Sequence, residues 1–197
     1  MRLEIQSRMK KVRLALMMTA TAPHRRVEMR SSMMASGQYV HGNEPSHQIA
    51  YEYNYAGQPW KTQAMVRRIM NEMYRDQPDG LAGNEDCGQM SAWYIFSALG
   101  FYPVCPGSEQ YAIGSPVVDN AVIKLENGKS FTIKTKNNNA QNVYIASAKL
   151  NGKEYTKSFL TFDDIIKGGT FELEMNNAPN TKWGSAESDV PVTKIEN

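Results

Sequence analysis

The segment GNEDCGQMSAWY, residues 83–94, joins a polar turn bracketed by glycines to a helix that is apolar on nearly every face. A helix of this composition is expected to be buried. The carboxylates of Glu85 and Asp86 then lie at the edge of a core, where charge is costly and usually has a purpose. Two interpretations are open: Asp86 to Gln89 has the pattern of a structural capping box, or the acids have a catalytic or ligand-binding role.

The composition is that of an ordinary globular protein. The chain has 197 residues and a net charge of +2, with the basic excess almost wholly before residue 31. This pattern is not that of a nucleic-acid-binding surface. Cys87 and Cys105 are too few for a disulfide scaffold and lack metal-ligand spacing. Because of the charge distribution we expect no nucleic-acid partner. No run of 18 apolar residues occurs, so we also expect no membrane span.

Residues 1–36 differ from the rest of the chain, being basic and rich in methionine, with no aromatic residue before Tyr39. Three interpretations compete. A secretory signal would use the short apolar run 14–18 and a cleavage site at residues 20–22. A basic helix would bind a membrane surface or nucleic acid. Alternatively, the segment is not native sequence, because of an out-of-frame translation or a wrongly assigned start.

Three helices are expected between residues 43 and 100, each entered through a loop rich in glycine, asparagine and acids. Glu44 and Gln48 lie one turn apart on the first, so their oxygens could hold a hard cation or sugar hydroxyls. The alternative for this segment is a capped surface turn. The second helix has one apolar stripe, with Arg67 outside it, and Gly100 is expected to end the third. The first two are expected at 43–55 and 60–75, and the third follows the turn at 83–88 and ends near residue 99.

After residue 103 the pattern changes from helix to strand. Asn127-Gly128 and Asn151-Gly152 are typical hairpin turns between alternating apolar segments. The sequence therefore predicts a small β unit without a catalytic constellation. Its expected elements are a hairpin at 121–136, a second hairpin that begins with 143–150, a short helical turn at 162–169 and a half-buried strand at 170–175.

Three segments resemble the C-terminal part of family 92 glycoside hydrolases: GQYVHGNEPSH (37–47), YNYAGQPWKTQ (53–63) and residues 83–103. That family comprises calcium-dependent exo-α-mannosidases, typical of Bacteroides-like gut bacteria that degrade N-glycans and yeast mannan. The resemblance implies an α+β fold. It places the last helices of a six-fold α/α toroid at 37–103, a small antiparallel, sandwich-like β unit at 104–183 and a tail at 184–197.

The resemblance also implies an inverting mechanism, in which one carboxylic acid protonates the leaving group and one carboxylate activates water. It assigns the general base to Asp86, and it implies release of mannose from α-1,2-linked glycans. Some relatives carry a second aspartate where this chain has Asn84. By position, Ca²⁺ would be bound by Glu44 and Gln48, and the sugar would be contacted by Asn43, His47, Asn84 and Glu85.

The family's general acid lies upstream of the segments that match. We therefore expect this chain to be a C-terminal fragment that is inactive alone, with the missing N-terminal part of the enzyme and a mannose-containing glycan as its partners. Residues 1–36 would then be a non-family segment, disordered or out of frame. Relatives are secreted or periplasmic. The alternatives are an inactive remnant or a carbohydrate-binding module without hydrolysis.

Overall fold

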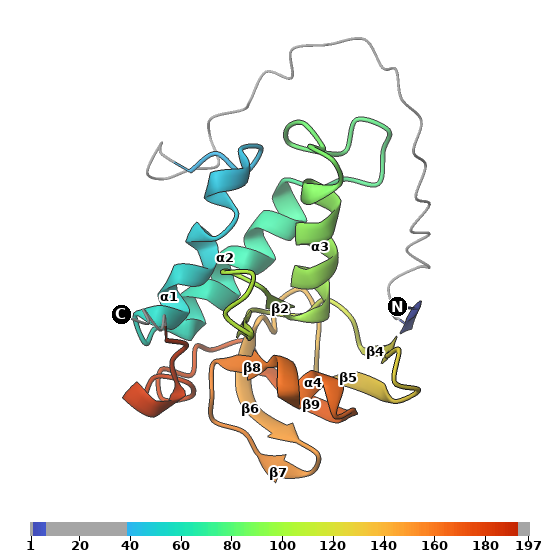
Figure 1. The fold of residues 1–197 in the computed structure, drawn as a ribbon. Helices are drawn as coiled ribbons and strands as arrows, with labels where there is room; N and C mark the ends of the chain where they lie inside the picture. Colours follow the sequence, from blue (N-terminus) through green and yellow to red (C-terminus); the bar gives the residue numbers. More distant parts are fainter. Residues whose placement is uncertain (1, 7–38, 193–197) are drawn as a thin grey trace, which may run out of the picture.

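The computed structural model describes residues 2–6 and 39–192. Helices and strands are segregated: three helices form one half of the molecule and most strands form the other (Figure 1). Both types of element are present as expected, in two sheets and with a fourth, short helix. None of the described helices is long and apolar enough to cross a membrane. The helices are α1 (Glu52–Tyr55), α2 (Pro59–Glu72), α3 (Gln89–Leu99) and α4 (Phe162–Ile166).

Helix α2 begins with Pro59 in its first turn, where a missing N–H is tolerated. It ends at Glu72, three residues before the predicted end, because Tyr74 pairs with Leu81 and the chain turns back at Gly80. Arg67, expected outside the apolar stripe, is instead buried. Its guanidinium donates to groups of the loop 138–139 and to the carbonyl of Pro116, and so ties the helix to the β half.

The single helix predicted for residues 43–55 is wrong. The chain forms two 3-10 turns, η2 (Glu44–Ser46) and η3 (Ile49–Tyr51), before the single turn of α1. No side chain caps either 3-10 turn, and the buried Asn54 faces the β half. Its Nδ2 donates to the carbonyls of Ile113, at 2.8 Å, and Ser158, at 2.7 Å. These hydrogen bonds tie α1 to the β half.

Helix α3 begins at Gln89 and ends at Leu99 with Gly100 as its C-cap, as predicted, and the φ of +97° at Gly100 suits glycine. Its buried face includes Trp93 and Leu99, while several other positions are half-buried. The helix contributes to both apolar cores of the protein: Leu99 packs with the strands, and Trp93 packs with the helices. Helix α3 therefore joins the two halves through its apolar side chains, in addition to the hydrogen bonds that Asn54 and Arg67 make.

The larger sheet has six strands in the order β1-β4-β5-β9-β6-β7. Both predicted hairpins are confirmed, β4–β5 around Asn127-Gly128 and β6–β7 around Asn151-Gly152. The expectation of a purely antiparallel unit is wrong, because β9 pairs with β5 in parallel and with β6 antiparallel. The strands are β1 (Arg2–Gln6), β4 (Asn120–Lys124), β5 (Ser130–Lys136), β6 (Tyr144–Leu150), β7 (Lys153–Glu154) and β9 (Gly169–Asn176).

A second sheet, with three short strands in the order β2-β3-β8, was not predicted. Strand β8 leads directly into α4, whose first turn is closed by a capping box between Thr161 and Asp164. This confirms the predicted helical turn near residue 162. The strands are β2 (Phe101–Tyr102), β3 (Gln110–Ile113) and β8 (Phe159–Thr161).

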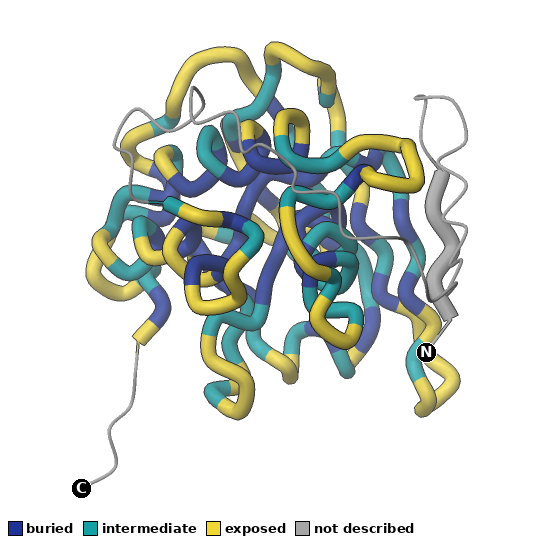
Figure 2. The backbone as a smooth tube through the Cα atoms, turned by 90° about the horizontal axis from the view of Figure 1, so that it is seen from above, coloured by how far each residue is buried: buried dark blue, intermediate teal, exposed yellow. Residues whose placement is uncertain are grey.

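The buried segments lie inside both halves, and the connecting loops are mostly exposed (Figure 2). Residues 184–192, predicted as a tail, pack back onto the fold: the carbonyl of Asp189 accepts from the amide and hydroxyl of Ser158. A 3-10 turn, η4 (Glu187–Asp189), forms there. Of the N-terminal segment 1–36, the backbone of residues 2–6 forms β1, which pairs with β4, and the remainder lies outside the described residues.

Candidate active site

Two loops from different parts of the chain touch at a pair of glycines. A Cβ atom on Gly83 would lie 2.5 Å from the Cα of Gly42, and one on Gly42 would lie 2.6 Å from the carbonyl oxygen of Ala82. Real Cβ atoms do not approach backbone this closely, so only glycine fits at either position. The contact holds the segments 42–48 and 83–88 side by side, and these segments carry the candidate site residues.

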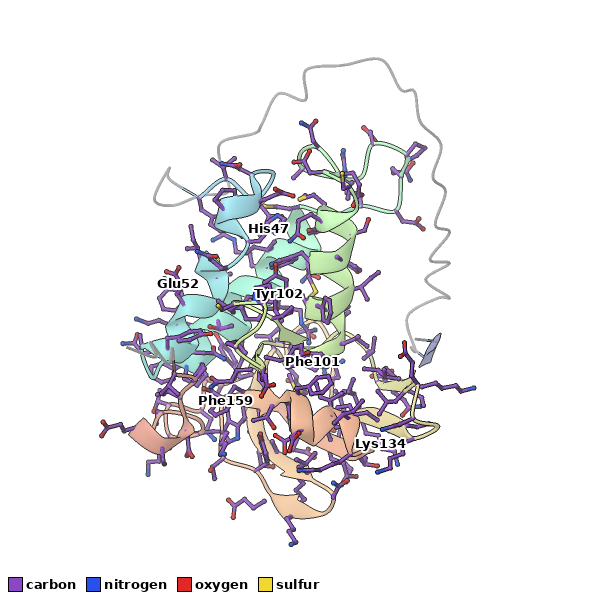
Figure 3. All side chains as sticks on the ribbon, in the orientation of Figure 1. His47, Glu52, Phe101, Tyr102, Lys134 and Phe159 are labelled. Carbon is purple, nitrogen blue, oxygen red and sulfur yellow. The ribbon has the colours of Figure 1, made fainter. Side chains whose placement is uncertain are left out.

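His47 links the first of these segments to helix α3. Its Nε2–H donates to the carbonyl of His41 at 2.9 Å, and its Nδ1 accepts from the side-chain amide of Gln89 at 3.1 Å. The same amide donates to the hydroxyl of Tyr102 at 3.1 Å, and the indole N–H of Trp93 donates to the carbonyl of His47 at 3.0 Å. His47 and Tyr102 both lie beside the helices in Figure 3. The first turn of α3 is thereby tied to the segment 42–48.

The electrostatics of His47 place two carboxylates near the same ring. Burial lowers the pKa of His47, and this effect outweighs its hydrogen bond to the His41 carbonyl, which raises the pKa. The charges of Glu44 and Asp86 also raise the pKa of His47. Both carboxylates therefore act on one imidazole, although they come from different loops. The two acids share one end of the helical half.

His41 is the buried anchor of the first loop, with 1% of its surface exposed. Its Nδ1 accepts from the hydroxyl of Tyr39 at 2.8 Å, and its Nε2–H donates to the hydroxyl of Tyr74 at 2.7 Å. Tyr74 in turn donates to the carbonyl of Met90 at 3.0 Å, which fixes this direction. Burial, with a smaller effect from His47, lowers the pKa of His41 to about 3. The ring is therefore neutral in a single tautomer.

The turn before α3 is left-handed at three consecutive residues. Asp86, Cys87 and Gly88 have φ values of +47°, +57° and +93°. The left-handed conformation costs roughly 1–2 kcal/mol for each residue that has a Cβ atom. The predicted capping box is wrong, since Gly88 is the N-cap and no side chain of that residue can cap. The turn instead leaves Asp86 exposed, and backbone strain of this kind is concentrated at functional sites.

Glu85 provides the cap that the sequence assigned to its neighbour. One of its carboxylate oxygens accepts from the amide of Ser91 at 2.9 Å, and the other accepts from the Ser91 hydroxyl at 2.8 Å. Negative charge at the start of a helix is stabilising, because the first amides have no partner within the helix. Glu85 is half-buried, and its carboxylate is directed at α3.

The other candidate residues lie on the surface of the two loops. Asn43, Glu44 and Gln48 are exposed on one side of the glycine contact, and Asn84 is exposed on the other. Among the described residues, no group of three or more His, Cys, Asp or Glu side chains could hold a metal ion. Calcium takes six to eight oxygen ligands, as a rule. Glu44 and Gln48 could therefore supply only part of a calcium site.

The sequence did not identify the layer of side chains under the site. Gln89 was read only as a helix-capping residue, and Tyr74 and Tyr102 had no signal beyond their apolar surroundings. Burial raises the pKa of Tyr102, which fits a hydroxyl held inside the protein, and its hydrogen bond to Gln89 opposes this effect. The only available signal was the pair His41 and His47 within one short motif.

An exposed carboxylate on a strained turn, beside a second loop that carries a carboxylate and amides, is an arrangement that suits general acid–base chemistry. The particular family follows from comparison with known proteins. The model of the glycosyl hydrolase family 92 catalytic domain matches residues 6–177, and the chain belongs to this family. The match begins inside the segment 1–36, and the hypothesis that this segment is out of frame stays a prediction.

Solved structures of the family resemble the chain. One is a family GH92 α-mannosidase from Bacteroides thetaiotaomicron in complex with mannoimidazole, with 45% identity, a TM-score of 0.77 and coverage of 80% of this chain and 21% of that one. Another, from the same organism, is described as an inverting mannosidase, with 47% identity, a TM-score of 0.75 and coverage of 79% and 21%. An uncharacterized secreted glycosidase of Arthroderma benhamiae is 34% identical over 82% of this chain and 22% of its own length. The chain thus spans about a fifth of these relatives.

Proposed function

We propose that this chain supplies the general base and part of the sugar site of an inverting α-mannosidase that releases mannose from glycans. The observation that carries the proposal is the exposed carboxylate of Asp86, fixed by a left-handed turn beside the loop 42–48. An inverting enzyme needs such a carboxylate to activate water on the face of the sugar opposite the leaving group. The inverting mannosidase among the similar structures supports the inverting mechanism, and the assignment of the base to Asp86 rests on the family resemblance and on this geometry.

We assign the sugar contacts to the exposed amides of Asn43 and Asn84, which lie on the two loops that meet at the glycine pair. Amide groups both donate to and accept from hydroxyls, which suits a hexose. The ring nitrogens of His47 are already bonded within the chain, so this residue contributes by holding the loop.

Glu44 and Gln48 are the proposed calcium ligands of this chain. They would supply a carboxylate and an amide oxygen, of the type that calcium prefers. Bound calcium would orient and polarise hydroxyls of the sugar. The remaining ligands would come from water, from the sugar or from protein outside the described residues. The α-1,2 linkage is part of the proposal and rests on the family resemblance.

The general acid and the remaining helices are proposed to come from the rest of the catalytic domain. In this view α1, α2 and α3 are the last helices of an α/α toroid, and this chain has no turnover by itself. The proposal is supported by the share of the relatives that the chain covers, about a fifth.

The test is release of mannose from α-1,2-linked mannobiose, in calcium and in chelator, by this chain alone and by this chain mixed with the remainder of its catalytic domain. Turnover is expected only in the mixture with calcium. Asp86→Asn should lower kcat on the order of 10²–10⁴-fold, as loss of a general base does. Asp163→Asn, which alters an exposed aspartate in the β half, is the matched control and should leave kcat unchanged.

Proton NMR of the first-formed mannose gives the stereochemistry, and inversion of an α-linkage yields the β-anomer. Turnover that survives in Asp86→Asn would refute the assignment of the base. Turnover by the chain alone would instead show that a residue of this chain supplies the proton. Activity that is equal in calcium and in chelator would remove the metal from the proposal.

A further inference from the structure

Glu85 precedes the left-handed turn and is hydrogen-bonded to two residues that follow it, Met90 and Ser91 of α3. Its backbone carbonyl accepts from the amide of Met90 at 3.3 Å, and its carboxylate accepts from the amide and hydroxyl of Ser91. The three left-handed residues lie between these attachment points. The bonds between Glu85 and the first turn of α3 therefore close the loop that residues 86–88 form.

The turn needs such support because its backbone is unfavourable by itself. Asp86 and Cys87 have Cβ atoms and adopt positive φ, and a Cβ on Gly88 would meet nothing within 4 Å. The space beside Gly88 is therefore open where a Cβ would lie, and within the turn the carbonyl of Asp86 accepts from the amide of Gln89 at 3.1 Å. Hydrogen bonds to an ionised carboxylate are among the stronger ones in proteins, and here they lie at a helix N-terminus, where negative charge is favoured.

We infer that Glu85 is a positioning residue, which fixes the direction of the Asp86 carboxylate by holding the left-handed turn, and that it is not a ligand of the sugar. The inference rests on the proposed function for the role of Asp86. It replaces the expectation from sequence that Glu85 contacts substrate. Both oxygens of Glu85 are engaged with Ser91, and the group is half-buried against α3.

Two substitutions of Glu85 separate the effect of its charge from the effect of its hydrogen bonds to Ser91. In Glu85→Gln, the amide oxygen still accepts from the Ser91 amide, and the NH₂ group donates to the Ser91 hydroxyl. Glu85→Ala removes both bonds. Ser91→Ala removes only the hydrogen bond from the Ser91 hydroxyl. A charge requirement and a geometric requirement can therefore be told apart.

The first readout is amide hydrogen exchange in the full 197-residue chain, which does not require turnover. Exchange at Ser91 should accelerate about tenfold or more in Glu85→Ala, since the amide loses its charged acceptor. It should rise by less than about fivefold in Glu85→Gln, which keeps both hydrogen bonds and loses only the charge at the helix N-terminus. In Ser91→Ala, which keeps the charged acceptor of the amide, exchange at residue 91 should stay within about twofold of wild type. Glu52→Ala, at an exposed acid in the first turn of α1, is the matched control and should leave Ser91 unchanged.

The second readout is the kinetics of the mixture with the remaining catalytic domain. Glu85→Ala should lower kcat on the order of 10–100-fold with little change in KM, because a misplaced base affects the transition state more than binding. Glu85→Gln should retain most of the wild-type kcat. Circular dichroism of each variant reports whether it folds, and Glu85→Gln tests the inference even if Glu85→Ala does not fold.

Three results would overturn the inference: unchanged exchange at Ser91 in Glu85→Ala, a raised KM with unchanged kcat in that variant, or failure of Glu85→Gln to retain most of the wild-type kcat. The second result would make Glu85 a sugar ligand. Failure of the proposed function looks different, because Asp86→Asn would then remain active while Ser91 exchange still depended on Glu85.

Discussion

Protonation of His41 should weaken the fold as the pH falls from 7 to 5. In the folded protein burial lowers the pKa of this ring to about 3, whereas an unfolded histidine has a pKa of about 6.5. Below pH 6.5 the unfolded chain therefore binds a proton that the folded chain does not bind. The stability that the neutral ring contributes is present above the unfolded pKa and is lost as the pH falls below it.

The size of the effect follows from the two pKa values. Between pH 7 and pH 5 the free energy of unfolding should fall by about 2 kcal/mol through His41, and the limiting slope is about 1.4 kcal/mol per pH unit. The ring is 1% exposed, so solvent does not screen this effect appreciably. Its hydrogen bonds to Tyr39 and Tyr74 hold the neutral form, as described above.

The assay is urea unfolding at several pH values for wild type and for His41→Asn. The variant should be less stable at pH 7, because it loses the ring that packs 4.4 Å from Trp93, between ring centroids. Its stability should fall between pH 7 and 5 by about 2 kcal/mol less than that of wild type. Tyr74→Phe keeps the titrating ring and should keep the slope of wild type. Equal slopes in wild type and His41→Asn would refute the reasoning.

Two further substitutions test how the halves and the loops are joined. Asn54→Ala removes two donors from buried backbone carbonyls and should cost about 2–4 kcal/mol of unfolding free energy in urea, whereas Asn127→Ala, at an exposed site, should cost less than about 1. Gly83→Ala should cost about 2–3 kcal/mol in thermal unfolding, because its Cβ meets backbone atoms of Gly42. Its control, Gly107→Ala, meets nothing within 4 Å and should lose only about 1 kcal/mol, from its φ of +96°.

Equal losses in the two asparagine variants would show that the contact between Asn54 and the β half adds nothing to stability. A Gly83→Ala protein as stable as Gly107→Ala would mean that the two loops can separate without cost. The expectation that they form one rigid site would then fail.

Local patterns in the sequence predicted most of the elements. An apolar stripe with a period of 3.6 residues predicted α2, an apolar segment between a polar turn and Gly100 predicted α3, and the Asn-Gly dipeptides predicted both hairpins. The strands of the smaller sheet are two to four residues long, which is too short for a periodic signal. The parallel pairing of β5 with β9 was also not predictable, because it joins strands that are separated by a second hairpin and α4.

The family of this protein, and the two motifs that carry its acids around Glu44 and Asp86, follow from the amino-acid sequence. The folded chain was needed to show that the motifs meet at Gly42 and Gly83, that His41 is neutral, and that Glu85 rather than Asp86 caps α3. The difference lies in how far apart in the sequence the interacting residues are. Periodicity and turn chemistry depend on neighbours along the chain, whereas close backbone contacts, burial and a strained turn depend on residues that folding brings together.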